Sequence, residues 1–99
     1  MTAPWRLDWR PMAREDLRSI VRYIGRDNPS RARTFGREVR DKVSRLANHP
    51  EMGRPGRPGL PDGIRELVAH PGYVVFYRLH TETRTVEILR IKHTAQRIP

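Results

Sequence analysis

Arginine dominates the residues of this 99-residue chain that could do chemistry. Lysine and arginine number 20 against 11 aspartates and glutamates, which gives a formal net charge of +9, and 18 of the 20 are arginine. Guanidinium groups bind phosphates and carboxylates through two parallel hydrogen bonds. A positive field attracts polyanions, so the composition favours a nucleic-acid target or an acidic protein partner without choosing between them.

One group of these cations has regular spacing: Arg14, Arg18, Arg22 and Arg26 recur every four residues in a segment of helical periodicity. Glu15 and Asp16 stand beside them and offer local ion pairs. The simpler interpretation is a solvated helix face, and the sharper one is a docking surface for an acidic segment. The two are compatible, because a solvated face is free to bind.

Several other kinds of chemistry lack their residues. The four histidines show no metal-ligand spacing, and the chain has no cysteine for thiolate chemistry. No serine has an evident histidine–aspartate partner. The GRPGRPG run in residues 53–59 lacks the Gly-Lys-Ser/Thr ending of a phosphate-binding loop. We therefore expect neither a metal nor a cofactor.

The helices and strands that must position these residues are predicted from the spacing of apolar residues and from the positions of proline and glycine. Trp5, Leu7 and Trp9 alternate with polar residues, as in a half-buried strand. Pro11 and the pair Asn28-Pro29 are typical helix starts, each followed by apolar residues at helical spacing. Residues 50–63 hold four prolines and four glycines, which excludes a helix or a central strand. The expected elements are a strand at 5–9, helices at 11–24 and from 29 to 48, and strands at 64–69, 73–79 and 86–91.

This order, β-α-α-β-β-β, predicts an α/β (α+β) fold. The short link at residues 26–28 implies a helical hairpin, which we expect to pack on one face of a twisted, mostly antiparallel sheet. The other face should be open and partly polar, with Glu87 as a cross-strand partner for an arginine.

Length and hydropathy limit the remaining possibilities. Ninety-nine residues make one domain, residues 1–99, with one core. No run approaches the roughly 18 apolar residues that a membrane span needs, and the first residues lack the apolar stretch of a signal peptide. We expect a soluble protein of the cytoplasm.

The C-terminal third resembles the ParE/RelE superfamily of toxins from type II toxin–antitoxin modules, and is closer to its ParE branch. The residues that carry the resemblance are Arg65–Val68, His70-Pro71 with Tyr73, Tyr77-Arg78, and Val86–His93. Ala13–Ile20 and the helix start at Asn28-Pro29 agree more loosely. The likeness covers nearly the whole chain and implies the same fold as the element order.

The superfamily implies two activities, because ParE-like toxins poison DNA gyrase and RelE-like toxins cut mRNA on the ribosome. RelE-like enzymes carry a phosphate-clamping arginine on a strand position that falls at or near Ala69, and a tyrosine in the tail. This chain has no tyrosine after Tyr77. These absences favour gyrase inhibition, without covalent chemistry by the toxin itself.

His93 supports the alternative, because some RelE relatives use a histidine just after the last strand. Their accompanying aspartate falls at Gly72 here, so the match is partial. In a ribonuclease, His93 would be the general acid. The phosphate contacts would then be Arg65, Arg90, Lys92 and Arg97. The interpretation we favour makes His93 a strand-end residue that hydrogen-bonds within the fold.

The resemblance also implies partners. An antitoxin with an acidic segment, fused to a DNA-binding head, would wrap the helical hairpin and contact operator DNA in place of the toxin. The residues expected to bind it are Arg14, Arg18, Arg22 and Tyr23. The target, gyrase or ribosome, would meet the basic end formed by Arg90, Lys92, His93 and Arg97. An inactive toxin kept as a binding module and a plain nucleic-acid-binding domain are the remaining alternatives.

Overall fold

The structure is a computed structural model and describes residues 3–94. Its elements are β1 (Arg6–Trp9), α1 (Pro11–Gly25), α2 (Pro29–Ser44), the 3-10 turn η1 (Arg45–Ala47), β2 (Arg54–Pro55), β3 (Ile64–His70), β4 (Tyr73–His80) and β5 (Thr85–His93). The predicted order of helices and long strands is confirmed. The structure adds the two-residue strand β2, which lies at the edge of the sheet, where proline is tolerated.

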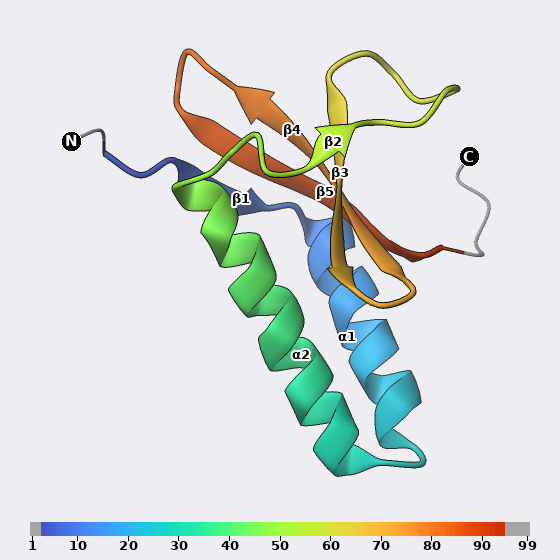
Figure 1. The fold of residues 1–99 in the computed structure, drawn as a ribbon. Helices are drawn as coiled ribbons and strands as arrows, with labels where there is room; N and C mark the ends of the chain where they lie inside the picture. Colours follow the sequence, from blue (N-terminus) through green and yellow to red (C-terminus); the bar gives the residue numbers. More distant parts are fainter. Residues whose placement is uncertain (1–2, 95–99) are drawn as a thin grey trace.

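The five strands form one sheet in the order β1-β5-β4-β3-β2. β1 is parallel to β5, and the other three pairings are antiparallel, so the predicted mostly antiparallel sheet is confirmed. The first and last strands therefore lie side by side (Figure 1). β1 pairs with β5 only as far as Ile88, which leaves the last five residues of β5 without a neighbouring strand on that side.

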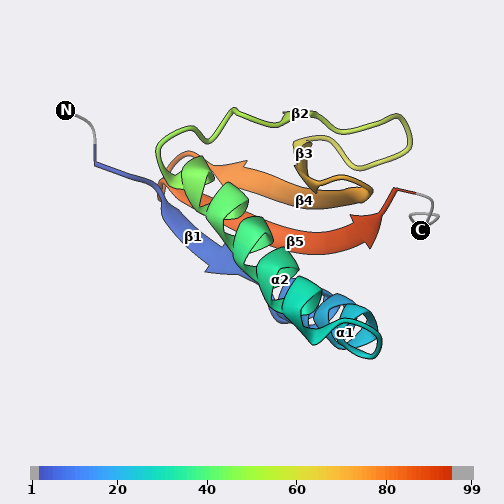
Figure 2. The same cartoon turned by 60° about the horizontal axis from the view of Figure 1, so that its bottom comes forward.

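Both helices begin as the sequence predicts. Pro11 starts α1, and the side chain of Asn28 caps α2 by accepting a hydrogen bond from the backbone N–H of Arg31 at 3.0 Å. The two helices form an antiparallel hairpin that lies on one side of the sheet (Figure 2). Gly36 lies where they meet, since a Cβ added there would be in van der Waals contact with Val21 of α1 at 3.5 Å.

The core lies between this hairpin and the sheet. Its fully buried members include Val39 and Val43 of α2 and Tyr77 of β4. Trp5, just before β1, and Leu7 and Trp9 of β1 pack against it, as expected for inward residues. β5 places Val86, Ile88 and Ile91 in the core, a spacing that breaks strict alternation. The register shift opposite Phe76 and Tyr77 accounts for it, since Leu89 has no partner on β4 and forms a bulge.

The second face of the sheet is less open than the sequence suggested. Alternation places Glu66 and Phe76 on the face away from the helices, yet both are buried. The segment that follows β2 covers them, with the guanidinium of Arg57 over the Phe76 ring at 5.6 Å. Farther along this face, Glu87 pairs with Arg10 at 3.6 Å and with His80 at 2.9 Å. The expected arginine partner of Glu87 is thus Arg10, just beyond β1.

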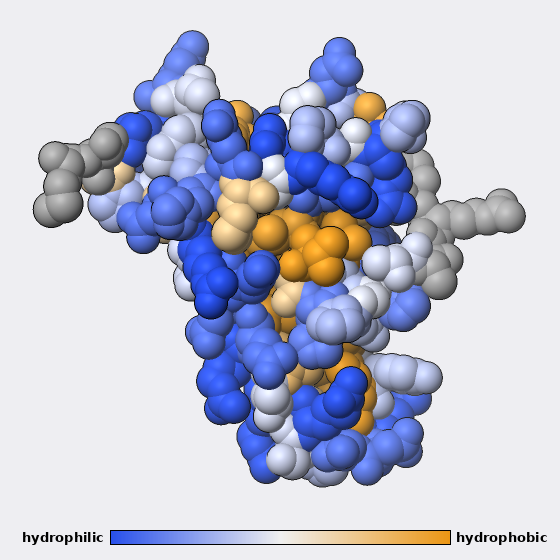
Figure 3. Space-filling model, viewed as in Figure 1, coloured by the Kyte–Doolittle hydropathy of each residue, from blue (hydrophilic) through white to orange (hydrophobic). Residues whose placement is uncertain are grey.

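The described part of the chain contains neither a helix that could span a membrane nor a metal-binding cluster. Neither helix within residues 3–94 is long and apolar enough to cross a membrane. Over the same residues, no three histidine, aspartate or glutamate side chains come close enough together to hold a metal ion. Hydrophilic residues cover most of the surface in Figure 3, with hydrophobic residues gathered towards its centre.

Candidate functional site

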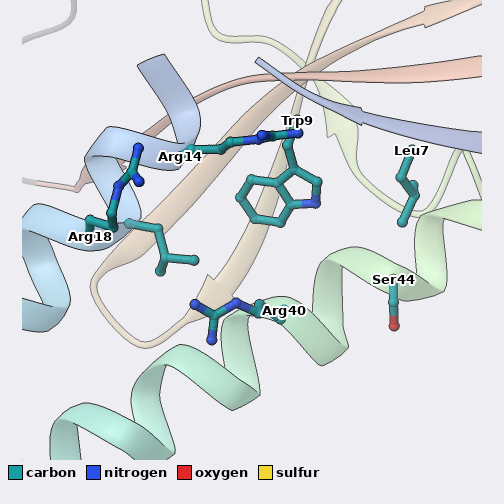
Figure 4. A pocket seen from close by; sticks show the side chains of 7 residues that line it. Leu7, Trp9, Arg14, Arg18, Arg40 and Ser44 are labelled. Carbon is teal, nitrogen blue, oxygen red and sulfur yellow. The ribbon is translucent and has the colours of Figure 1, made fainter. Parts of the chain in front are cut away.

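A pocket of about 410 Å³ opens where β1 meets the two helices. Its lining residues come from all three elements: Leu7, Trp9, Arg14, Leu17, Arg18, Arg40 and Ser44. The Trp9 indole lies between the side chains of Arg14 and Arg40 (Figure 4). We call this site the arginine pocket. It offers apolar surface for a hydrophobic side chain and guanidinium groups for flanking carboxylates.

The charges around the arginine pocket are largely uncompensated. Arg18 pairs with Glu15 at 3.4 Å, and both side chains are exposed. Within residues 3–94, no carboxylate lies within ion-pairing distance of Arg14 or Arg40. An acidic ligand would therefore meet two guanidinium groups that have no competing carboxylate in the part of the chain that the structure describes.

Of the four residues on α1 that were predicted to bind an antitoxin, two line the pocket. Arg14 and Arg18 line the pocket, while Arg22 is held by Glu15 at 3.0 Å beside it. Tyr23 is 69% exposed and, at helical geometry, lies about 140° around α1 from Arg18. Sequence reasoning missed Arg40, because the four-residue spacing on α1 drew attention to a single helix. The repeat of Arg33, Arg37 and Arg40 on α2 was the available signal.

The expected local pairing on α1 is confirmed for Glu15 and wrong for Asp16. The Asp16 carboxylate accepts hydrogen bonds from the Arg90 guanidinium at 2.8 and 3.0 Å, and from the backbone N–H of Ile91 at 2.9 Å. It thereby caps the part of β5 that β1 leaves unpaired. The hydrogen bonds that Arg90 donates to Asp16 raise the pKa of Arg90. Arg90, predicted to face the target, joins strand to helix.

The other predicted residues of the basic end are dispersed. The His93 ring packs edge-on against Tyr73, its partner across the β4–β5 pair, with centroids 5.1 Å apart. Lys92 alternates with the buried Ile91 and so lies on the face away from the helices. Arg97 lies outside the described residues.

Arg65 lies on the opposite face from Lys92. It shares the helix-facing side of β3 with Leu67 and Ala69, and its Nε donates to the Tyr77 hydroxyl at 3.4 Å. Its Nη2 donates to the carbonyl oxygens of Glu51 and Gly53. The Tyr77 hydroxyl itself donates to the Pro50 carbonyl and accepts from the Gly53 N–H, each at 2.9 Å. Arg65 thus ties the start of the proline-rich segment to the sheet.

The second charged site, on the other face, is centred on Glu66. Its carboxylate accepts from the backbone N–H of Arg57 at 2.6 Å and from the Nη2 of the same residue at 2.8 Å. Arg54 approaches it at 3.8 Å. The hydrogen bonds from Arg57 hold the pKa of Glu66 below its ordinary value, although burial opposes this effect. Sequence reasoning did not find this site.

A two-helix hairpin on a mostly antiparallel sheet, with β1 parallel to β5, is the fold of known toxin–antitoxin proteins. A protein of the chromosomal ParDE system from P. aeruginosa superposes with a TM-score of 0.77 at 23% identity, over 93% of this chain and 98% of that chain. A chain of the RelBE2 toxin–antitoxin complex from Mycobacterium tuberculosis gives 0.65 at 26% identity, over 91% and 98% of the two chains.

Sequence comparison narrows this class to a family. The family described as "ParE toxin of type II toxin-antitoxin system, parDE" matches residues 7–98. "Putative toxin Y4kP" of Sinorhizobium fredii is 37% identical over 95 residues, 95% of this chain and 93% of the relative. "Toxin ParE1" of Caulobacter vibrioides is 36% identical over 91% of this chain and 88% of the relative, and "Toxin RelE3" of that species 31% over 88% and 91%. The chain belongs to the ParE toxin family of type II toxin–antitoxin systems, as its resemblance to the ParE/RelE superfamily predicted.

Proposed function

We propose that this toxin inhibits DNA gyrase in the cytoplasm and is neutralised by a cognate antitoxin that occupies the arginine pocket. As a gyrase poison it would trap the cleaved DNA–enzyme complex without forming or breaking covalent bonds itself. The basic end of the chain is the surface we propose for the target, with Lys92, His93 and Arg97 as its contacts, while Arg90 is held by Asp16.

The observation that carries the proposal concerns three positions of the sheet at which a ribonuclease would need free cations. Ala69, at or near which the resemblance would place a phosphate-clamping arginine, is 7% exposed and faces the helices. Arg65 is bound to Tyr77 and the proline-rich segment, and Arg90 is bound to Asp16. Cleavage of RNA needs cations preorganised at the scissile phosphate, with donors left to stabilise the charge that develops there. These arginines are already committed to holding the fold.

Ribosome-dependent mRNA cleavage is the second candidate, and one contact favours it. His93 and Tyr73 bring an imidazole and a phenol together at 5.1 Å between ring centroids. Both groups are common general acids or bases in proteins. In this alternative His93 would protonate the leaving oxygen, with Arg65, Arg90, Lys92 and Arg97 as phosphate contacts.

One paired assay separates the two candidates. Purified toxin is added to gyrase with supercoiled plasmid, and separately to a translating ribosome extract with labelled mRNA. We expect linear, gyrase-linked plasmid to accumulate while the mRNA stays intact. Translation-dependent mRNA cleavage that is lost in His93→Ala would overturn the gyrase proposal. Growth without arrest on expression alone would support an inactive toxin kept as a binding module.

Binding of the antitoxin is proposed from the chemistry of the arginine pocket. An amphipathic acidic segment could place an apolar side chain against Trp9 and carboxylates beside Arg14 and Arg40, which have no acidic partner in the described chain. Pairing of opposite charges fixes the register of the bound segment and sets its rate of association with the toxin. The expected contribution of Arg18 and Arg22 is smaller, because Glu15 already pairs with both.

A matched pair of charge reversals on α2 tests this site. Arg40 lines the pocket, whereas Arg31, also exposed, lies about 180° around the helix from it. We expect Arg40→Glu to weaken antitoxin binding at least about tenfold, and Arg31→Glu to change it less than about twofold. Isothermal titration with the antitoxin encoded beside the toxin gives both affinities. Equal losses in the two variants would mean that only net charge matters.

A further inference from the structure

The Arg57–Glu66 contact has the form of an occupied anion site. Glu66 receives one hydrogen bond from a backbone N–H, at 2.6 Å, and three contacts from the Nε and Nη2 atoms of one guanidinium, at 2.8 to 3.3 Å. A backbone donor combined with a guanidinium fork is the arrangement by which proteins hold carboxylate and phosphate oxygens. In this protein the anion is supplied by the chain itself.

The cations of this site lie at the surface and the carboxylate lies beneath them. The Glu66 side chain is 1% exposed, whereas those of Arg57 and Arg54 are 37% and 71% exposed. The Phe76 ring supports the Arg57 guanidinium from below. An external anion would therefore find both arginines accessible, but with their charge already opposed by Glu66.

The surrounding face carries further cations, and Glu87 lies farther along it. Arg78 of β4 shares this side of the sheet with Phe76, and Lys92 of β5 lies on it too, by strand alternation. Within residues 3–94, neither has a carboxylate within ion-pairing distance. With Arg54 and Arg57 they form a set of cations spread over three strands and the covering segment. Glu66 is the buried carboxylate that contacts two of them, Arg54 and Arg57.

We propose that Glu66 is a specificity-determining residue, an internal anion that occupies the phosphate-binding site formed by Arg57 and Arg54 and so prevents the RNA backbone from binding this face. This inference rests on the proposed function, in which the target is a protein rather than RNA. The charge of this one buried carboxylate then decides whether the cationic face binds phosphodiesters.

The test is RNA affinity in variants of the full chain. The probe is a fluorescein-labelled, mixed-sequence, single-stranded RNA of twelve nucleotides, followed by fluorescence anisotropy at several salt concentrations. Glu66→Gln keeps the shape of the side chain and removes its charge. Asp62→Asn makes the same change of net charge at an exposed residue of the same segment, so it is the matched control.

We expect Glu66→Gln to bind the RNA at least about tenfold more tightly than the wild type, and Asp62→Asn to differ less than about twofold. The slope of log affinity against log salt should steepen by about 0.7 for each phosphate gained. Adding Arg57→Ala to Glu66→Gln should abolish the gain. Equal affinities in Glu66→Gln and Asp62→Asn, or a gain that survives Arg57→Ala, would overturn the inference.

A second variant protects the test against misfolding. Glu66→Asp keeps the charge but withdraws the carboxylate by one methylene, and we expect an intermediate gain in RNA affinity if Arg57 is partly released. An affinity no tighter than that of the wild type in both folded variants would overturn the inference. Failure of the proposed function looks different, since the wild-type toxin itself would then cleave mRNA in the translating extract.

Discussion

The two faces of the sheet are covered by different means. Helices α1 and α2 cover one face through a continuous apolar core that includes Leu46 and Val75, both fully buried. The segment after β2 covers part of the other through ionic and aromatic contacts of a single arginine, Arg57, with Glu66 and Phe76. The apolar contacts of the helices are broad and non-directional, whereas the contacts of Arg57 depend on a few oriented bonds. The helix side therefore determines whether the chain folds, and the other side determines which anions it accepts.

The largest effect should come from the helix-covered side. Leu46→Ala removes a fully buried side chain, and we expect the free energy of unfolding to fall by about 2–5 kcal/mol. Val68 lies on the other face and is 54% exposed, so Val68→Ala should change it by no more than about 0.5 kcal/mol. Urea unfolding followed by circular dichroism measures both. Similar losses in the two variants would show that the faces do not differ in this way.

A smaller effect on stability is expected at Tyr77, whose hydroxyl makes hydrogen bonds on the helix-covered side of the sheet. Tyr77→Phe leaves the buried N–H of Gly53 without its hydroxyl partner, and we expect a loss of about 1–3 kcal/mol. Tyr23, 69% exposed on α1, gives the matched control, because Tyr23→Phe should leave the unfolding midpoint unchanged. A neutral Tyr77→Phe would mean that water or a shift of residues 50–53 replaces the lost bonds.

The smallest effect should be the pH dependence of the ionic cover. The folded pKa of Glu66 is lowered, so its contribution to stability is present above the ordinary glutamate pKa of about 4.3 and is lost as pH falls through the folded value. We expect the wild type to exceed Glu66→Gln by about 1 kcal/mol at pH 6, and this gap to close in acid. Urea midpoints between pH 2 and pH 6 test the sign. A gap that widens in acid would contradict the assignment of the shift to Arg57.

The periodic parts of this fold could be predicted from sequence, and the pairings between distant residues could not. Proline starts and apolar spacing located α1 and α2 closely, because those signals are local. The Asp16–Arg90 contact joins residues 74 positions apart, and no local pattern indicates it. Arg40 contributes to the arginine pocket only because β1 brings Trp9 between the helices.

Strand β3 shows a second kind of limit. Its sequence, IRELVAH, has apolar residues on both faces, so alternation separates Arg65 from Glu66 without showing which of them faces the helices. The structure places Arg65 on the helix side and Glu66 on the other. The candidate ribonuclease set was therefore divided between two faces that the sequence could not distinguish.

The parallel pairing of β1 with β5 has a consequence for the order of events during synthesis. Leu7 pairs with Val86, so β1 can pair with its neighbouring strand only after the 78 residues between them have left the ribosome. The helical hairpin can form early from local contacts, but the sheet edge beside it is completed last. A nascent chain therefore lacks the strand partner of β1 until β5 has been synthesised, and the wall of the arginine pocket that β1 supplies is completed only at that stage.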